Sequence, residues 1–224
     1  MPKLFFPNDN LPVVTPTLIR WYKGNNNLND SSGNGKNLTG TGTYDYEDAK
    51  NGIGSSISVG SAGCKFNCSN SSITNAKSYS FAGWFYKVKV YEEDKFSAFF
   101  YDDRSGPLTD GIRVSVSGTS WLVSLGGSSE TQYTNTHSLG DMLDEWVHVC
   151  ITFNYSGKEA KFYANGVYVN KDNKSTALWY AGQKDAYYFS TYNSARYSFR
   201  ACDLRIYDGV LTDDEVFRIY KYLG

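Results

Sequence analysis

Residues 146–170, WVHVCITFNYSGKEAKFYANGVYVN, predict three short strands joined by two turns. From Trp146 to Phe153, apolar and small residues occupy both alternation phases, which is typical of a strand that is buried on both faces. The polar residues from Asn154 to Gly157 then favour a turn. This part of the chain therefore indicates a sheet protein.

The second turn of this segment is the sharper one. Asn165 and Gly166 both tolerate a positive φ, which a two-residue type I′ hairpin requires at its two central positions. They are expected to join strands at 160–164 and 167–170. Together the three strands predict a β-meander.

Two further segments accompany the meander, one near each end of the chain. Near the amino end, Leu18–Tyr22 (LIRWY) predicts a strand and Asp30–Gly35 (DSSGNG) predicts a turn. Near the carboxyl end, Asp203–Tyr207 (DLRIY) predicts another strand. Thr212 and Glu215 then have the spacing of a capping box, so a short helix is expected to end the chain.

In this order, the three segments resemble laminin-G-like domains, which are members of the concanavalin A-like lectin/glucanase superfamily. The matching motifs are W-x-H-V followed by Y-x-N-G, the D-x-S-G-N-G loop and D-x-R-I-Y, and they span residues 18–223. The resemblance implies an all-β fold, namely a concanavalin A-like jelly-roll β-sandwich with a short C-terminal helix. It also implies that the strands at 18–22 and 203–207 are neighbours.

Between these segments, alternating apolar residues predict four more strands, at 78–86, 96–101, 111–116 and 120–125. The length of 224 residues fits a single β-sandwich domain, which we place at residues 18–224. Residues 1–17 precede it as an extended arm, because four of the five prolines lie within the first sixteen residues. Apolar residues such as Phe5, Phe6 and Val14 favour docking of residues 1–16 on neighbouring subunits over a solvated tail.

The formal charge of -1 offers no basic surface for nucleic acid. Pro7 interrupts the apolar run Leu4–Phe6, which excludes both a Sec signal core and membrane insertion at the amino end. Aromatic residues make up 17% of the chain, with 19 tyrosines, a type of residue that suits both strands and binding loops.

Catalysis is not expected. Glycan hydrolases of the same superfamily need two carboxylates at E-x-D-x-x-E spacing on one strand face, and this sequence lacks that spacing. Glu92, Glu93 and Asp94 form the nearest acidic run and are better explained as a solvated loop. His148 corresponds to the family's strand histidine, for which a structural role is expected.

Calcium is the one cofactor that the resemblance suggests, since many laminin-G-like domains bind it through oxygen ligands. Asp30, Asn34 and Asp203 are the positions that we would test. The alternative is that Asp30 and Ser31 only satisfy backbone donors in a turn.

The stretch from Trp179 to Phe199 mixes aromatic rings with short polar side chains, a combination that suits the apolar faces and hydroxyl rims of sugars. Its predicted ligand-binding residues are Trp179, Tyr180, Tyr192, Asn193 and Arg196.

Two functional hypotheses follow. The first is a non-catalytic binding module that recognises a glycan or a glycoprotein at a surface. The alternative is a structural component of a large particle, such as a phage virion fibre or capsid decoration, anchored by its N-terminal arm. Both place the protein at a virion or extracellular surface rather than in cytoplasmic metabolism.

Overall fold

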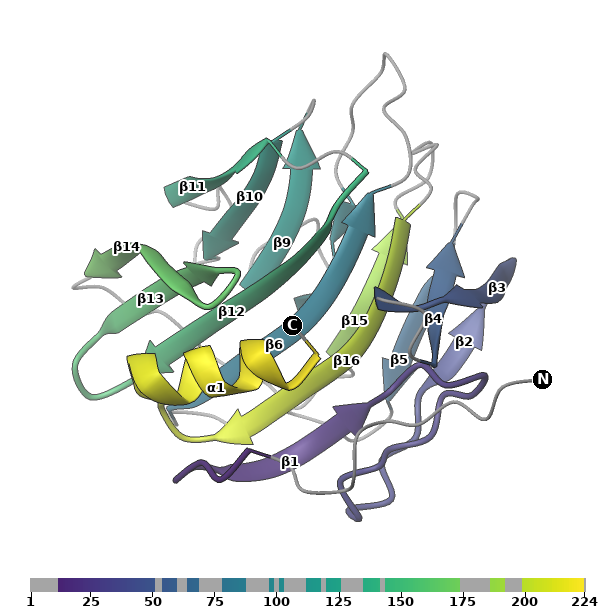
Figure 1. The fold of residues 1–224 in the computed structure, drawn as a ribbon, viewed down its shortest axis with the longest axis horizontal. Helices are drawn as coiled ribbons and strands as arrows, with labels where there is room; N and C mark the ends of the chain where they lie inside the picture. Colours follow the sequence, from purple (N-terminus) through teal and green to yellow (C-terminus); the bar gives the residue numbers. More distant parts are fainter. Residues whose placement is uncertain are drawn as a thin grey trace.

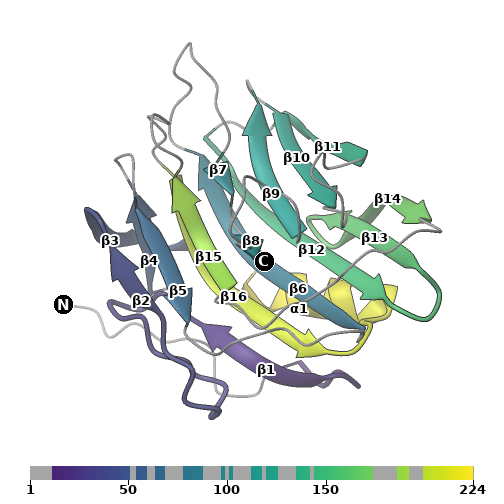
Figure 2. The ribbon, with the colours of Figure 1, turned by 180° about the vertical axis from the view of Figure 1, so that it is seen from behind.

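The computed structural model describes residues 12–50, 54–59, 64–68, 78–87, 97–98, 101–102, 112–117, 120–125, 135–141, 144–173, 186–191 and 199–223. Strands dominate these residues, and one helix follows them at the carboxyl end. The strands form two layers, one in front of the other in Figure 1 and in reversed order in Figure 2. The predicted all-β class with a short C-terminal helix is confirmed.

The front layer is an eight-stranded antiparallel sheet. Its spatial order is β14 (Val167–Asn173), β13 (Glu159–Ala164), β12 (Trp146–Asn154), β6 (Tyr79–Lys87), β16 (Phe199–Asp208), β4 (Ser55–Val59) and β3 (Tyr44–Asp48). β1 (Thr17–Tyr22) pairs with the second half of β16, from Leu204 to Asp208. The expected contact between the segments near the two ends of the chain is therefore confirmed.

The back layer contains the shorter strands (Figure 2). One sheet consists of β2 (Thr39–Thr41), β5 (Lys65–Cys68), β15 (Ala186–Thr191), β7 (Ser97–Ala98) and β8 (Tyr101–Asp102), and the other of β9 (Ile112–Ser117), β10 (Ser120–Leu125) and β11 (Asn135–Asp141). The strand predicted at 96–101 is described as two short strands, β7 and β8. Both pair with β15 in one continuous register, so they extend the same ladder.

Alternation along the central strands divides their side chains between two faces of the front sheet. In β12, Val147, Val149, Ile151 and Phe153 face the core between the layers, whereas His148 and Cys150 face the other side, which we call the outer face. All seven residues from Val147 to Phe153 are buried. This confirms the prediction of a strand that is buried on both faces. The described core between the layers also includes Ile57, Val59, Phe66, Tyr79, Phe81, Phe85, Phe162, Leu204 and Ile206.

The turn between β13 and β14 has the predicted type I′ geometry, because φ is 50° at Asn165 and 76° at Gly166. The Asn165 N–H donates to the carbonyl of His148 at 2.8 Å. In return, the His148 N–H donates to Oδ1 of the Asn165 side chain at 2.9 Å. The asparagine side chain thus takes the place of a backbone acceptor, and it ties the turn to β12.

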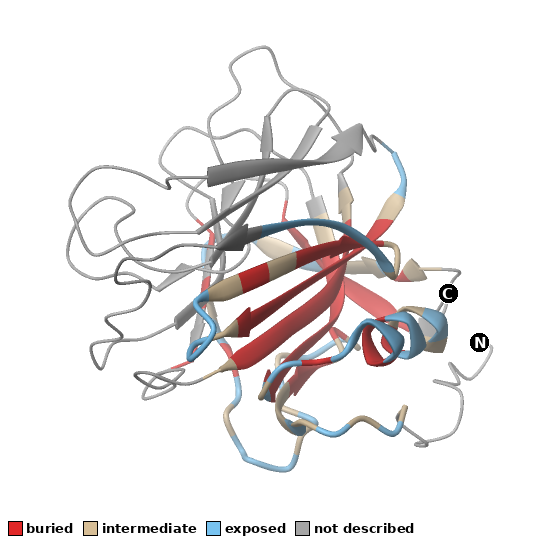
Figure 3. Cartoon of the chain, turned by 90° about the vertical axis from the view of Figure 1, so that its left-hand side faces the viewer, coloured by how far each residue is buried: buried red, intermediate tan, exposed pale blue. Residues whose placement is uncertain are grey.

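Helix α1 (Asp213–Leu223) lies across β12, β6 and β16 on the outer face (Figures 1 and 3). The capping box forms as predicted: Glu215 N–H donates to Thr212 Oγ1, and Thr212 N–H donates to Glu215 Oε2 at 2.8 Å. Val216 and Ile219 pack with Leu211 on Ala82, Cys150 and Tyr207 of the sheet. At eleven residues, α1 is too short to cross a membrane, and the described part of the chain contains no helix that could do so.

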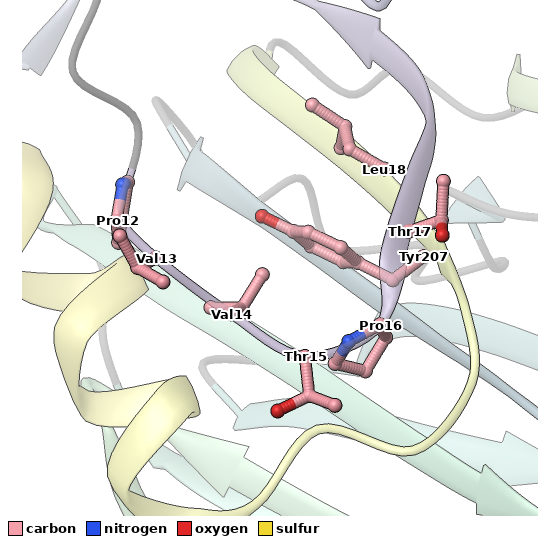
Figure 4. A pocket seen from close by; sticks show the side chains of 8 residues that line it. All are labelled: Pro12, Val13, Val14, Thr15, Pro16, Thr17, Leu18 and Tyr207. Atoms are coloured by element: carbon pink, nitrogen blue, oxygen red, sulfur yellow. The ribbon is translucent and has the colours of Figure 1, made fainter.

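The described end of the N-terminal arm packs on its own chain. The Thr15 N–H donates to Glu215 Oε1, and the carbonyl of Val13 accepts a hydrogen bond from Arg218 Nη1 at 2.8 Å. Figure 4 shows Val14 and Leu18 beside the Tyr207 ring, in a pocket of about 310 Å³ that residues 12–18 line together with Tyr207. Residues 1–11 lie outside the described residues, and docking of the arm on a neighbouring subunit stays a prediction.

A glycine pair tests how tightly the β13–β14 turn packs against α1. A Cβ at Gly166 would lie 2.8 Å from Cδ1 of Tyr220, whereas a Cβ at Gly35 would meet nothing within 4 Å, and both residues have a positive φ. We expect Gly35→Ala to lower the free energy of unfolding by about 1–2 kcal/mol, through backbone strain alone. Gly166→Ala should cost about 1–3 kcal/mol more, because it also overpacks the contact with Tyr220.

Urea unfolding of both variants measures this difference. If both variants lose the same free energy of unfolding, the turn does not pack tightly against the helix.

Candidate functional site

The ligand-binding residues predicted from sequence, Trp179, Tyr180, Tyr192, Asn193 and Arg196, all lie outside the described residues. Glu92, Glu93 and Asp94 lie outside them as well. The described part of the chain instead presents three groups of functional side chains: the loop after β1, a buried ion pair on β16, and aromatic residues on the outer face.

The loop at 30–37 is organised by the carboxylate of Asp30. Its Oδ1 accepts the N–H groups of Trp21 and Ser32 at 3.0 and 2.9 Å, and its Oδ2 accepts the N–H of Lys36 at 3.1 Å. The Asn34 side-chain amide donates to the carbonyl of Ile19 at 3.0 Å. The D-x-S-G-N-G motif therefore holds this loop against β1 through backbone donors and acceptors.

The third predicted calcium position, Asp203, is buried and makes different contacts. Its Oδ1 accepts hydrogen bonds from Trp21 Nε1 at 2.7 Å and from Arg205 Nε at 2.9 Å. Burial raises the pKa of the Asp203 carboxyl group, and the neighbouring Arg205 guanidinium opposes this rise. Asp203 thus faces an arginine, whereas Asp30 accepts N–H groups of its own loop. Calcium binding by Asp30, Asn34 and Asp203 stays a prediction.

Local backbone geometry sets the face of the sheet on which Arg205 lies. Asp203 has a φ of 53°, and the pairing of β16 with β6 shifts register between Cys202 and Arg205. This bulge shifts the alternation of β16, so that Leu204 and Ile206 face the core between the layers while Arg205 lies on the outer face, beside Tyr222 of α1. The Arg205 guanidinium also lies over the rings of Trp21 and Tyr222, at 5.2 and 4.5 Å from their centroids.

His148 lies beneath helix α1 in an aromatic cluster. Its ring centroid is 5.2 Å from that of Trp84 and 5.9 Å from that of Tyr220. Within the described ranges, neither of its ring nitrogens has a hydrogen-bond partner. Burial, with further contributions from Arg205 and Lys50, lowers the pKa of His148 to about 3. His148 is therefore a neutral packing residue at ordinary pH, as the sequence predicts.

Further along the outer face, five residues from five adjacent strands lie in one row: Asp45, Ser58, Arg200, Tyr86 and Trp146. Each is the register partner of the next. We call them the outer-face row. Tyr86, Trp146 and Arg200 are half-buried, and Asp45 is exposed.

The aromatic rings and the guanidinium of the outer-face row contact one another. The ring centroids of Tyr86 and Trp146 are 5.4 Å apart, and the Arg200 guanidinium carbon lies 5.4 Å from the Tyr86 centroid. Arg200 also forms a salt bridge with Glu47, whose other oxygen accepts a hydrogen bond from the Ser58 hydroxyl. The row thus combines two partly accessible aromatic rings with several hydrogen-bonding groups.

Sequence reasoning placed Tyr86 and Trp146 in strands but did not identify the row. The available signal was that aromatic residues occupy outward positions at the ends of two strands. No sequence pattern indicated that these strand ends and Arg200 would be in register.

Comparisons with known proteins agree with this architecture. Residues 59–217 match the laminin-G-like family described as the concanavalin A-like lectin/glucanases superfamily. Among curated proteins, no sequence matches the chain.

Several solved structures share the fold. The binding domain of Paraclostridial Mosquitocidal Protein 1 has a TM-score of 0.75 at 12% identity, over 91% of this chain and 52% of that chain. The binding domain of Botulinum Neurotoxin DC in complex with SialylT has a TM-score of 0.74 at 16% identity, over 93% of this chain and 52% of that chain. This chain thus spans about half the length of these toxin binding domains.

A third structure is matched over nearly its whole length. Domain 4 of AbnA, a GH43 extracellular arabinanase from Geobacillus stearothermophilus, in complex with arabinotriose, has a TM-score of 0.68 at 20% identity, over 92% of this chain and 98% of that chain. The likeness to all three structures shows a common fold.

The buried position of His148 predicts a specific pH dependence of stability. Because its folded pKa of about 3 lies below the ordinary value of 6.5, the unfolded chain binds a proton between these pH values and the folded chain does not. Stability should fall as the pH drops through this window, by about 1.4 kcal/mol per pH unit from this group.

The variant His148→Phe removes this titration and keeps an aromatic ring in the cluster. We expect the stability of the wild type relative to the variant to decrease by about 2–3 kcal/mol between pH 7.5 and pH 4.5. Chemical denaturation at both pH values measures it, and parallel pH profiles would contradict the burial of a neutral His148.

Proposed function

Since the chain belongs to the concanavalin A-like lectin/glucanases superfamily, we propose that it is a non-catalytic binding module that recognises a glycan or a glycoprotein at a surface. The observation that carries the proposal is the likeness to Domain 4 of AbnA, a domain in complex with arabinotriose that this chain matches over 98% of its length. The toxin binding domain in complex with SialylT, which has the same fold, gives further support.

The contacts of four described carboxylates support binding over hydrolysis. Retaining and inverting glycosidases need two carboxyl groups that flank the scissile bond, one of which donates a proton. Asp30 and Glu215 accept backbone N–H groups, Asp203 pairs with Arg205, and Glu47 pairs with Arg200. These four carboxylates are thus engaged in holding the structure together.

The residues proposed to contact the glycan are those predicted from sequence, at 179–196. We expect Trp179→Ala and Tyr192→Ala to weaken glycan binding by about tenfold or more, because each removes an aromatic ring that would stack on a sugar. Tyr155→Ala is the matched control, since Tyr155 is a 39% exposed tyrosine in the turn after β12. Binding is measured first on a glycan array that includes arabinose oligomers and sialylated glycans, and then by calorimetry.

If the folded protein binds no glycan on the array, or if the Tyr155 variant loses binding as much as the other two, the proposal fails.

The alternative function, a structural component of a large particle such as a virion, draws its support from the arm. Val13 is 83% exposed although it is apolar, and further apolar residues precede it in the sequence. In this proposal residues 1–16 contact neighbouring subunits, and deletion of residues 1–11 abolishes incorporation into the particle while the sandwich remains folded. Unchanged incorporation after the deletion would exclude this role for the arm.

A further inference from the structure

The outer-face row lies on a part of the sheet that helix α1 leaves uncovered. We propose that this row is a binding site for a linear, uncharged oligosaccharide that lies across the strands. The inference rests on the proposed glycan-binding function and gives that function a second place on the molecule, separate from residues 179–196.

Two adjacent rows of the outer face differ in how far their side chains are buried. Trp84 and His148 lie two residues from Tyr86 and Trp146 along β6 and β12, and they are buried to 1% and 0% exposure beneath Tyr220 of α1. Tyr86 and Trp146 point to the same side but stay half-buried. In Figure 1, α1 crosses the sheet well below the end of β6 and the starts of β12 and β16, where the row lies.

The dimensions of the row suit an extended chain of sugars. Adjacent strands lie about 4.8 Å apart, so the five strands place Asp45 and Trp146 about 19 Å from each other. The register of all four strand pairs is regular at these positions. Because these residues are held by a sheet rather than by a loop, the ligand would meet a preformed surface.

The chemistry of the row changes along its length in a way that matches a saccharide. At one end, Trp146 and Tyr86 offer aromatic rings on which the apolar face of a sugar can stack. At the other end, the half-buried guanidinium of Arg200 and the exposed carboxylate of Asp45 offer a donor and an acceptor for hydroxyl groups. A purely structural aromatic cluster would not require the polar half of the row.

The charges of the row favour an uncharged ligand. The salt bridge to Glu47 neutralises Arg200, and the exposed carboxylate of Asp45 adds a negative charge at the open end. An acidic polysaccharide would be repelled by Asp45 and would find no unpaired cation within the row. A neutral oligosaccharide of pentoses or hexoses faces no such cost.

Nuclear magnetic resonance of the ¹⁵N-labelled protein tests the site directly. The indole N–H signals are assigned by substitution, and arabinotriose, xylotetraose, cellotetraose and tetragalacturonate are titrated separately. We expect at least one neutral oligosaccharide to shift the Trp146 indole signal, and tetragalacturonate to bind at least tenfold more weakly. Trp146→Ala and Tyr86→Ala should weaken binding at least tenfold, whereas Tyr168→Ala, which removes a 44% exposed tyrosine from β14 of the same sheet, should not.

The outcomes separate this inference from the proposed function. If the protein binds an oligosaccharide, but the Trp146 signal does not move and only Trp179→Ala or Tyr192→Ala weakens binding, the outer-face row is not a site and the proposed function stands. If none of the neutral oligosaccharides shifts any signal, the outer-face row is overturned as a site, and the glycan array alone decides the proposed function. Thermal melts of each variant distinguish lost binding from lost folding, and the wild-type titration stays informative if a variant does not fold.

Discussion

Burial of the three central strands on both faces is the constraint on which the rest of the structure depends. β6, β12 and β16 pack one face against the second layer of strands and the other against helix α1. Over the stretches that are covered on both faces, each strand must therefore supply apolar or internally paired side chains. Two of the polar residues on the covered part of the outer face are His148, which packs in an aromatic cluster, and Arg205, which pairs with Asp203.

The buried ion pair explains why distant segments of the sequence occur together. Asp203 and Arg205 are 1% and 0% exposed in their side chains, and Trp21 donates to the same carboxylate oxygen. A buried ion pair is costly to break, because removal of one partner leaves an uncompensated charge in a medium of low polarity. The strand near the amino end is thus tied to the charge pair near the carboxyl end by the hydrogen bond from Trp21 to Asp203. In the same way, Asn165 links the β13–β14 turn to β12, and Glu215 accepts N–H groups from both the helix cap and Thr15 of the arm.

The sequence alone was enough to predict those parts of the fold that are decided by neighbouring residues. Asn165–Gly166 specifies its turn by backbone geometry, Thr212 and Glu215 specify the helix start, and the apolar run at 146–153 specifies a doubly buried strand. Side-chain arrangements that depend on the alternation or register of strands were harder to predict. The face on which Arg205 lies depends on a bulge, and the outer-face row depends on the register of five strands that lie as far apart in the sequence as Asp45 and Arg200. The predicted metal residues Asp30 and Asn34 do lie in one loop, yet they hold it through backbone groups, which is the role that oxygen-rich turns most often have.

The most direct test of the account is native-state hydrogen exchange of the backbone amides. If the central strands are buried on both faces, the amides of Val147–Phe153 exchange only through global unfolding, and their opening free energy equals the free energy of unfolding measured with denaturant. The amides of the edge strand β14 are expected to exchange through local openings of lower free energy. The account would be contradicted if the opening free energies of the β12 amides were as small as those of β14 and well below the global free energy of unfolding.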